Sequence, residues 1–265
     1  MVEIIRNLFR GKRSERAPAI PRGERVYAIG DIHGRLDLFT NLAAAIERDD
    51  KKRGPADTTI VFLGDIVDRG PNSARVLASA RAWSRARKVR FIAGNHEEMF
   101  LLSFQRAEAL RNFLKFGGKE TILSYGVSQA ELEASSLEEI QQLMNELVPR
   151  EDRLFMKNFE KFVSIGDYLF VHAGIRPEEP LDKQTGQDCR WIREPFLSYE
   201  GSFGQVVVHG HTVNEDVVVK DNRIGIDTGA FMSGKLTALC LEGTERWLIQ
   251  TKSGDGAAEV LDCAA

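Results

Sequence analysis

The sequence predicts an α/β fold built from strand–helix–strand units. Five short apolar runs each end in a glycine-containing stretch, at residues 25–31, 59–65, 89–95, 168–174 and 205–211. Between the first three runs lie residues 35–50 and 73–88, whose apolar positions recur near i, i+3, i+4 and i+7, as in helices that pack on a sheet. This alternation predicts parallel strand pairs and therefore an α/β sandwich.

The rest of the chain follows two other patterns. Residues 97–162 turn helical, polar and irregular, and "SSLEEIQQLMNEL" reads as an amphipathic helix opened by a capping serine, so we expect a helical insert there. The last third predicts antiparallel strands joined by turns at Asp221-Asn222 and Gly243. We expect a domain over 25–252, a basic flexible tail over 1–24 and a frayed end over 253–265.

Composition limits the classes of protein that the chain can represent. Its 265 residues form one large domain or two small ones. A net charge of -3 gives no reason to expect nucleic acid as a partner, and no apolar run reaches the roughly 18 residues that membrane insertion needs. The three cysteines lack metal-type spacing and predict reduced thiols in a cytoplasmic protein.

The first chemical motif is "GDIHG" at residues 30–34. Asp31 and His33 are two residues apart, so in an extended segment their side chains point to the same side. A carboxylate and an imidazole suit manganese, iron or zinc. An aspartate in a turn beside a surface histidine is the alternative for this motif alone.

The second motif, "GDIVDRG" at residues 64–70, follows the next strand. Asp65 is a second strand-end carboxylate, and two such groups side by side are costly unless a cation neutralises them. One carboxylate can also bridge two metals about 3.5–4 Å apart. Asp68 and Arg69 add an acid and a guanidinium suited to phosphate, unless they form a surface pair in a plain turn.

The third motif, "GNHEE" at residues 94–98, ends the third strand. Asn95 offers a neutral carbonyl ligand, and His96 titrates near neutral pH. We interpret Glu97 and Glu98 as charges that complement a helix N-terminus.

The five histidines of the chain all lie in glycine-containing stretches after apolar runs. They are His33, His96, His172, His209 and His211. Packing alone would not place five histidines in this way at one end of a sheet. In "VVVHGHTV", alternation puts His209 and His211 on the same side and does not choose between them.

These motifs resemble the phosphoprotein phosphatase branch of the calcineurin-like metallophosphoesterases, whose pattern is GDxHG, GDxVDRG and GNHE. The likeness is closest to small bacterial and phage members and continues through "VHAG", "WIRE" (191–194), "GHT" and "IDTGA" (226–230). It covers roughly residues 25–245 and is weak over the insert. It implies a sandwich of two mixed β-sheets flanked by helices.

The resemblance also implies a site with two divalent metals, manganese first, with iron or zinc as alternatives. Asp31 and His33 would bind the first metal and Asp65 both, and the ligands of the second would be Asn95, His172 and His211. His209 would then be a supporting neighbour rather than a ligand.

The remaining implied roles concern the substrate. His96 would be the general acid, held by Asp68, and the phosphoryl oxygens would contact Arg69, Arg193 and Asn95. The implied enzyme is a phosphomonoesterase, specifically a serine/threonine protein phosphatase, in which a metal-bridging hydroxide attacks a phosphorylated protein or small phosphomonoester directly.

Departures from the family pattern and two other functions stay open. Ala93 replaces a common arginine, and "HAG" replaces the eukaryotic "HGG". A symmetrical dinucleoside-tetraphosphate hydrolase would tend to "ARG" and "GNHD", where this chain has "DRG" and "GNHE". A non-catalytic phosphoprotein-binding module would be expected to lack a ligand or the acid, and this chain lacks neither.

Overall fold

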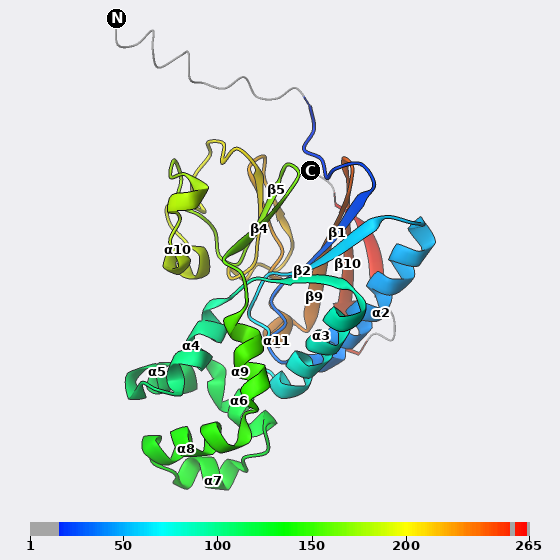
Figure 1. Cartoon of the computed structure of the whole chain (residues 1–265). Helices are drawn as coiled ribbons and strands as arrows, with labels where there is room; N and C mark the ends of the chain where they lie inside the picture. The colour runs from blue at the N-terminus through cyan, green and yellow to red at the C-terminus, as the bar shows by residue number, and fades with distance from the viewer. Residues whose placement is uncertain (1–15, 255–257, 264–265) are drawn as a thin grey trace, which may run out of the picture.

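Two mixed β-sheets face each other in the computed structural model, which describes residues 16–254 and 258–263 (Figure 1). The larger sheet has the order β11-β10-β9-β1-β2-β3, built from β1 (Glu24–Ile29), β2 (Asp57–Phe62), β3 (Lys88–Phe91), β9 (Lys235–Glu242), β10 (Glu245–Lys252) and β11 (Glu259–Asp262). The smaller sheet has the order β4-β5-β6-β8-β7, built from β4 (Phe162–Ile165), β5 (Tyr168–Val171), β6 (Val206–His209), β7 (Val218–Val219) and β8 (Arg223–Gly225).

Parallel pairing brings the carboxyl ends of the predicted strands together. Strands β1, β2 and β3 are parallel in one sheet, and β5, β6 and β8 are parallel in the other. Strand β9 runs antiparallel to β1 and β10, and β7 runs antiparallel to β8. The predicted α/β sandwich of two mixed sheets is therefore confirmed.

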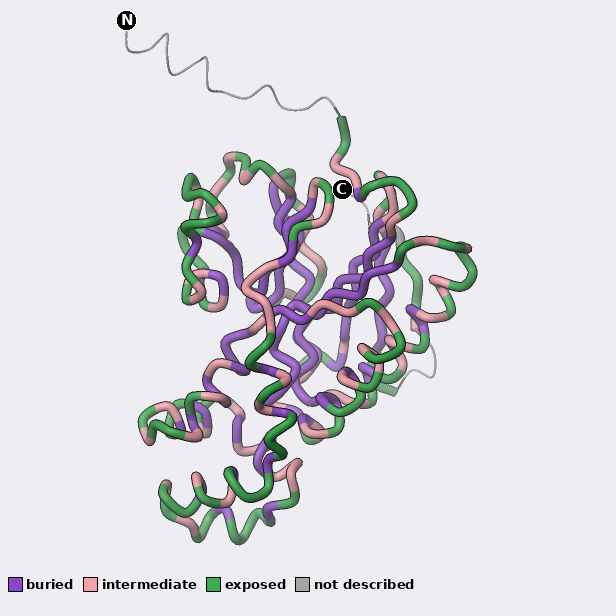
Figure 2. The backbone as a smooth tube through the Cα atoms, viewed as in Figure 1, coloured by how far each residue is buried: buried purple, intermediate pink, exposed green. Residues whose placement is uncertain are grey.

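The alternation of side chains along β1 explains why the sheet has two buried faces. Val26 and Ala28 belong to the apolar cluster between the sheets, whereas Tyr27 and Ile29 belong to the cluster under the helices. Successive side chains of a strand point to opposite faces, so a strand buried on both faces is apolar throughout. Figure 2 shows the strands as the most buried part of the chain.

Two helices cover the outer face of the larger sheet, as the sequence predicted. They are α2 (Leu36–Arg53) and α3 (Ser73–Ala86), which follow β1 and β2 along the chain. Phe39 of α2 and Trp83 of α3 each pack against Phe62 of β2, with ring centroids 5.7 and 6.1 Å apart respectively. On the other side of the molecule, α10 (Gly186–Trp191) follows the short η2 (Leu181–Lys183).

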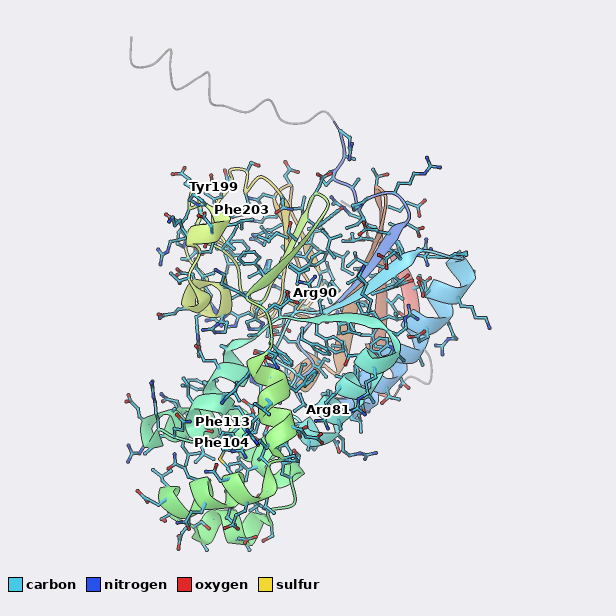
Figure 3. The ribbon with its side chains drawn as sticks, viewed as in Figure 1. Arg81, Arg90, Phe104, Phe113, Tyr199 and Phe203 are labelled. Atoms are coloured by element: carbon cyan, nitrogen blue, oxygen red, sulfur yellow. The ribbon has the colours of Figure 1, made fainter. Side chains whose placement is uncertain are left out.

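The insert is a group of helices beyond one end of the sheets (Figure 1). It comprises α4 (Asn95–Ser103), α5 (Ala107–Phe113), the π-helical turn η1 (Leu114–Gly118), α6 (Lys119–Ser124), α7 (Gln129–Ala134), α8 (Leu137–Leu147) and α9 (Arg150–Lys157). Phe100 stacks on Phe113 and contacts Phe104, the latter two labelled in Figure 3. The serine-capped helix is confirmed as α8, because Ser136 and Glu139 form a reciprocal capping box.

Parts of both expected tails pack on the fold. Residues 1–15 lie outside the described residues, but Ile20 is buried and its N–H donates to Gly243 O at 2.8 Å. Near the other end, β11 pairs with β10 within the segment expected to fray. None of the helices in the described ranges is long and apolar enough to cross a membrane.

Replacing Phe170 tests the importance of the core between the sheets. Phe170 of β5 is fully buried in that cluster, so Phe170→Ala should lower the free energy of unfolding by about 3–5 kcal/mol. Leu154→Ala, at an exposed position on α9, is the control and should change it by no more than about 0.5 kcal/mol. Urea denaturation measures both, and equal losses would contradict this account of the core.

Candidate active site

The predicted site residues converge at the junction of the two sheets, where the carboxyl ends of their parallel strands meet. All but Arg193, which follows α10 (Gly186–Trp191), come after β1, β2 and β3 in one sheet or β5 and β6 in the other. The predicted metal ligands are all buried: Asp31, His33, Asp65, Asn95, His172 and His211. Strand ends at a junction of this kind form a crevice in which short turns present side chains to one point.

The turns that carry these side chains have an uncommon backbone. Six non-glycine residues in the described ranges have a positive φ, and five belong to the site: His33, Asp65, Asp68, Arg69 and His211, at 47° to 74°. Such conformations cost on the order of 1–3 kcal/mol each and persist where the surroundings impose them. The fold therefore holds these side chains toward the site at an energetic cost.

Asn95, His172 and His211 form one half of the site. His172 Nε2 lies 2.9 Å and His211 Nδ1 2.8 Å from Asn95 Oδ1, and His172 Nε2 is 3.5 Å from Asp65 Oδ2. His172 Nδ1 lies 2.8 Å from Leu63 O and must donate there, so its Nε2 carries a lone pair. Lone pairs that face each other in a buried site fit a shared cation, and a backbone carbonyl fixes the ring for it.

His33 and Asp65 form the other half. His33 Nδ1 donates to Val67 O at 2.8 Å, which leaves Nε2 as a lone pair 3.6 Å from Asp65 Oδ2. Two groups of possible ligand atoms result, one from His33, Asp65 and His96 and one from Asp65, His172 and His211. Asp65 belongs to both, so the two buried clusters fit a dinuclear metal site with one shared carboxylate.

Asp31 lies beside a carboxylate to which we had assigned no role. Its side chain accepts the N–H of His211 at 3.1 Å, and its other close neighbour is Asp227 of the "IDTGA" stretch. Burial, reinforced by the charges of Asp227 and Asp65, raises the pKa of Asp31 well above its usual range. Burial likewise raises the pKa of Asp227 to about 6. Bound cations would favour the ionised form of these carboxylates.

The imidazoles are neutral, as metal binding requires. Burial lowers the pKa of His172 to about 3. Burial, followed by the charges of His172 and Arg193, lowers the pKa of His211 to about 2. Arg193 is exposed and lies close enough for its charge to reach His211. Neutral imidazole is the form that binds a metal ion.

Asp68 and His96 form a buried pair beside the metal ligands. His96 Nδ1 lies 2.7 Å from Asp68 Oδ2, and Asp68 is fully buried, so the alternative of a surface turn is excluded. Arg69 Nη2 lies 3.2 Å from His96 Nε2, and its guanidinium stacks on Phe231 at 4.3 Å. The other oxygen of Asp68 accepts the hydroxyl of Thr121, an insert residue that our reading of the motifs missed.

The interpretation of Glu97 as a helix-end charge was incomplete. Its carboxylate accepts the backbone N–H groups of Asp65 at 2.9 Å, Ile66 at 2.7 Å and Gly94 at 2.9 Å. It therefore fixes the turn that carries the shared carboxylate. Its position three residues after the capping glycine is the spacing of a capping box, and that signal could have found it. Glu98 binds Arg190 and Trp191 of α10 instead.

His209 stands apart from both clusters. Its Nδ1 faces Gly210 O at 3.0 Å, and its ring packs edge-on to Phe196 at 5.0 Å. Its Nε2 is buried without a hydrogen-bond partner. This placement supports the interpretation of His209 as a neighbour of the ligands.

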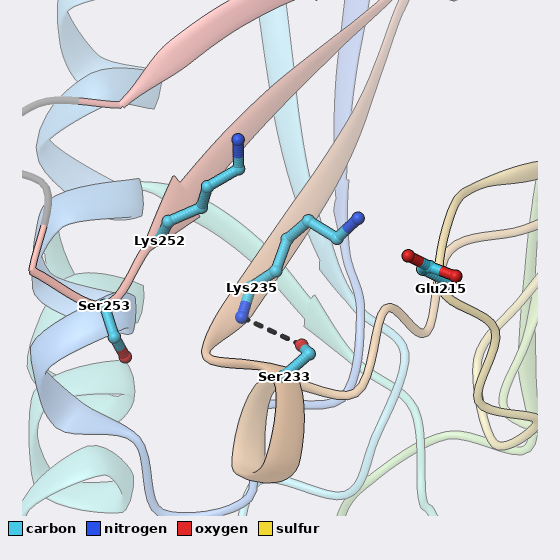
Figure 4. Close-up of a pocket in the computed structure, with 5 residues that line it drawn as sticks. All are labelled: Glu215, Ser233, Lys235, Lys252 and Ser253. Atoms are coloured by element: carbon cyan, nitrogen blue, oxygen red, sulfur yellow. Dashed lines mark hydrogen bonds between the residues drawn. The ribbon is translucent and has the colours of Figure 1, made fainter.

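A hollow of about 400 Å³ opens beside the buried pair and gives a substrate room. Its lining consists of two basic residues, two aromatic residues, one acid and one glycine: Arg69, Lys115, Phe116, Phe231, Glu120 and Gly117. A second hollow, shown in Figure 4, contains none of the predicted ligands. Its Lys235 pairs with Asp216 at 2.8 Å and its Lys252 with Glu259 at 3.5 Å, so both cations already have partners.

Replacing His209 and His211 one at a time tests which of them binds metal. His211→Ala removes a nitrogen 2.8 Å from Asn95 Oδ1, and we expect it to lose one of two bound divalent ions per chain. His209→Ala should keep both ions, because His209 belongs to neither cluster. Metal analysis after dialysis against manganese measures the content, and the reverse pattern would contradict the assignment.

Comparison with known proteins agrees with this geometry. The profile described as calcineurin-like phosphoesterase matches residues 24–230. Curated relatives include the proteins called bis(5'-nucleosyl)-tetraphosphatase PrpE [asymmetrical] from Bacillus velezensis, 28% identical over 79% of this chain and 86% of the relative, and from Bacillus subtilis, 27% identical over 79% and 87%.

Solved structures share the fold. One is a putative diadenosine tetraphosphatase, with a TM-score of 0.61, 20% identity, and coverage of 90% of this chain and 100% of that one. Another is the cold-active protein-tyrosine phosphatase of a psychrophilic Shewanella, with a TM-score of 0.55, 21% identity, and coverage of 92% and 83%. The family profile matches most of the chain, and its two buried clusters fit a dinuclear metal site. The chain therefore belongs to the calcineurin-like phosphoesterases, and it is a metallophosphoesterase hydrolase.

Proposed function

We propose that this phosphoesterase is a phosphomonoesterase that removes phosphate from serine and threonine side chains of proteins. The observation that carries the proposal is the buried His96–Asp68 pair, which lies beside the shared carboxylate of Asp65 and next to Arg69. This arrangement supports a proton-donor role for His96 and a phosphate-binding role for Arg69 beside the two metal clusters.

The metal ligands form the first part of the proposed mechanism. Manganese is the first expectation, with iron or zinc as alternatives, and two such ions would lower the pKa of water and offset phosphoryl charge. Asp31 and His33 would hold the first ion, with Asp65 shared. Asn95, His172 and His211 would hold the second, and Asn95 would also contact a phosphoryl oxygen.

Side chains of the chain itself bind the phosphoryl group and protonate the departing oxygen. Arg69 lies within hydrogen-bond distance of His96 Nε2, so a phosphoryl oxygen bound there lies close to the acid. Arg193 would approach from the side of His211. His96 Nδ1 donates to Asp68, so Nε2, which faces Arg69 Nη2 at 3.2 Å, is the nitrogen that would carry the proton for the leaving group when the ring is protonated.

The acid pair favours a monoester with a poor leaving group. An alkoxide from serine or threonine is a strong base, so its departure depends on protonation, for which a positioned acid contributes roughly 10²–10⁴-fold. A nucleotide released from a polyphosphate is a weak base and needs a proton much less. A buried His–Asp pair therefore has more to contribute with a phosphorylated side chain.

Hydrolysis of dinucleoside polyphosphates is the second candidate. The names of the curated relatives favour it in the asymmetrical form, whereas the alternative weighed on the motifs was the symmetrical form. The hollow beside Arg69 also offers the rings of Phe116 and Phe231 and the charge of Lys115, which suit a base and a phosphate chain.

A substrate panel decides between the candidates. The manganese-loaded chain is assayed with a phosphoserine peptide, diadenosine tetraphosphate, p-nitrophenyl phosphate and bis-p-nitrophenyl phosphate. We expect kcat/KM to be higher for the phosphoserine peptide than for diadenosine tetraphosphate, because an alkoxide leaving group gains fully from the acid. A higher kcat/KM for diadenosine tetraphosphate would replace the proposal with the second candidate. Metal-loaded chain inactive on all four would favour a phosphoprotein-binding module.

Replacing His96 tests its role. His96→Asn should keep both metal ions, because its expected role is proton transfer rather than metal binding. It should lower kcat on the phosphoserine peptide by roughly 10²–10⁴-fold. Metal analysis and steady-state kinetics on one preparation measure both quantities. Loss of a metal ion would instead make His96 a ligand in the cluster that it shares with His33 and Asp65.

A further inference from the structure

A buried chain of hydrogen bonds connects His96 to the helical insert. His96 Nδ1 lies 2.7 Å from Asp68 Oδ2, and the hydroxyl of Thr121 donates to Asp68 Oδ1 at 2.6 Å. Asp68 and Thr121 are both fully buried, so water does not replace either contact. Hydrogen bonds to an ionised acceptor are the strong ones, and an unmet acceptor in such a place is costly.

The hydroxyl of Thr121 is itself held in place. Its Oγ1 accepts the backbone N–H of Asp68 at 2.9 Å and lies 2.9 Å from the hydroxyl of Ser73. Ser73 Oγ accepts the same N–H at 3.0 Å. Asp68, whose φ is 74°, is therefore fixed at both its backbone and its carboxylate by α3 and α6.

A second contact of the insert holds the next residue of the same turn. The N–H of Arg69 donates to Gly117 O at 2.8 Å. Gly117 has a φ of 105°, and a side chain there would come within 2.6 Å of Arg69 Cγ, so only glycine permits this approach. The insert thus contacts the turn that carries both Asp68 and Arg69.

We propose that Thr121 is a positioning residue for the general acid, an inference that rests on the proposed function. A carboxylate can rotate about its bond to Cβ. With Oδ1 held by Thr121, Oδ2 stays directed at His96 Nδ1, and the imidazole keeps Nε2 directed at the leaving group. Without the hydroxyl, Asp68 loses one of the two hydrogen-bond partners of its carboxylate. The ring of His96 is then no longer fixed in orientation. The insert then completes the apparatus that protonates the leaving group.

Leaving-group dependence tests this role. Phenyl phosphate releases a stronger base than p-nitrophenyl phosphate, so its hydrolysis depends more on protonation. Thr121→Val keeps the shape and removes the hydroxyl. We expect its kcat to fall about tenfold more with phenyl phosphate than with p-nitrophenyl phosphate, a part of the full effect of an acid. Thr121→Ser should restore the wild-type ratio.

Ser124→Ala is the matched control. Ser124 links α6 to α3 by accepting the N–H of Ala74 at 3.1 Å, without contact to Asp68, so this variant should keep the wild-type ratio. Each variant is assayed at manganese saturation and below its own unfolding temperature. Equal losses with both substrates in Thr121→Val, or no loss with either, would overturn the inference.

The same assay separates the inference from the proposed function. If His96→Asn selectively slows phenyl phosphate but Thr121→Val does not, only the role of Thr121 fails. If His96→Asn is not selective either, the general acid itself is wrong and the inference falls with it. In a His96→Asn background, adding Thr121→Val should have no further selective effect, because both residues act on one proton transfer.

Discussion

The burial of several carboxylates at one junction is the constraint on which the rest of the site depends. Asp31, Asp65 and Asp227 lie almost out of contact with water, and burial raises the pKa of all three. The charge of Asp65 raises the pKa of Asp31 and of Asp227 further. Burying like charges together is unfavourable unless cations join them. The neutral imidazoles of His172 and His211 cannot supply that charge, so metal ions are the natural complement.

The fold brings this cluster together through its strand pairing. Three parallel strands of one sheet and two of the other end at one junction, where five of the site residues have a left-handed backbone. Glu97 fixes the turn at Asp65 from one side, and the insert fixes the neighbouring turn at Asp68 from the other. Geometry at the metal ligands and at the acid pair thus depends on segments distant in sequence.

Local sequence patterns were enough to predict the two sheets and the strand ends at which the candidate site residues lie. Strand periodicity is local, and so are the Gly-Asp and Gly-Asn pairs at the strand ends, in or next to which Asp31, Asp65 and His96 lie. Thr121 carries no such signal, because its contact with Asp68 arises only when α6 packs against α3. Asp227 joins the site from a loop after β8, and Glu97 had a simpler local explanation that concealed its three backbone contacts.

A metal titration tests the account most directly, because the central claim is that two buried clusters share Asp65. The metal-free chain is titrated with manganese in a calorimeter, beside Asp65→Asn, which keeps the shape and removes the charge. The account predicts two ions per wild-type chain and fewer than one tightly bound ion in the variant. One ion per wild-type chain, or unchanged binding in Asp65→Asn, would contradict it.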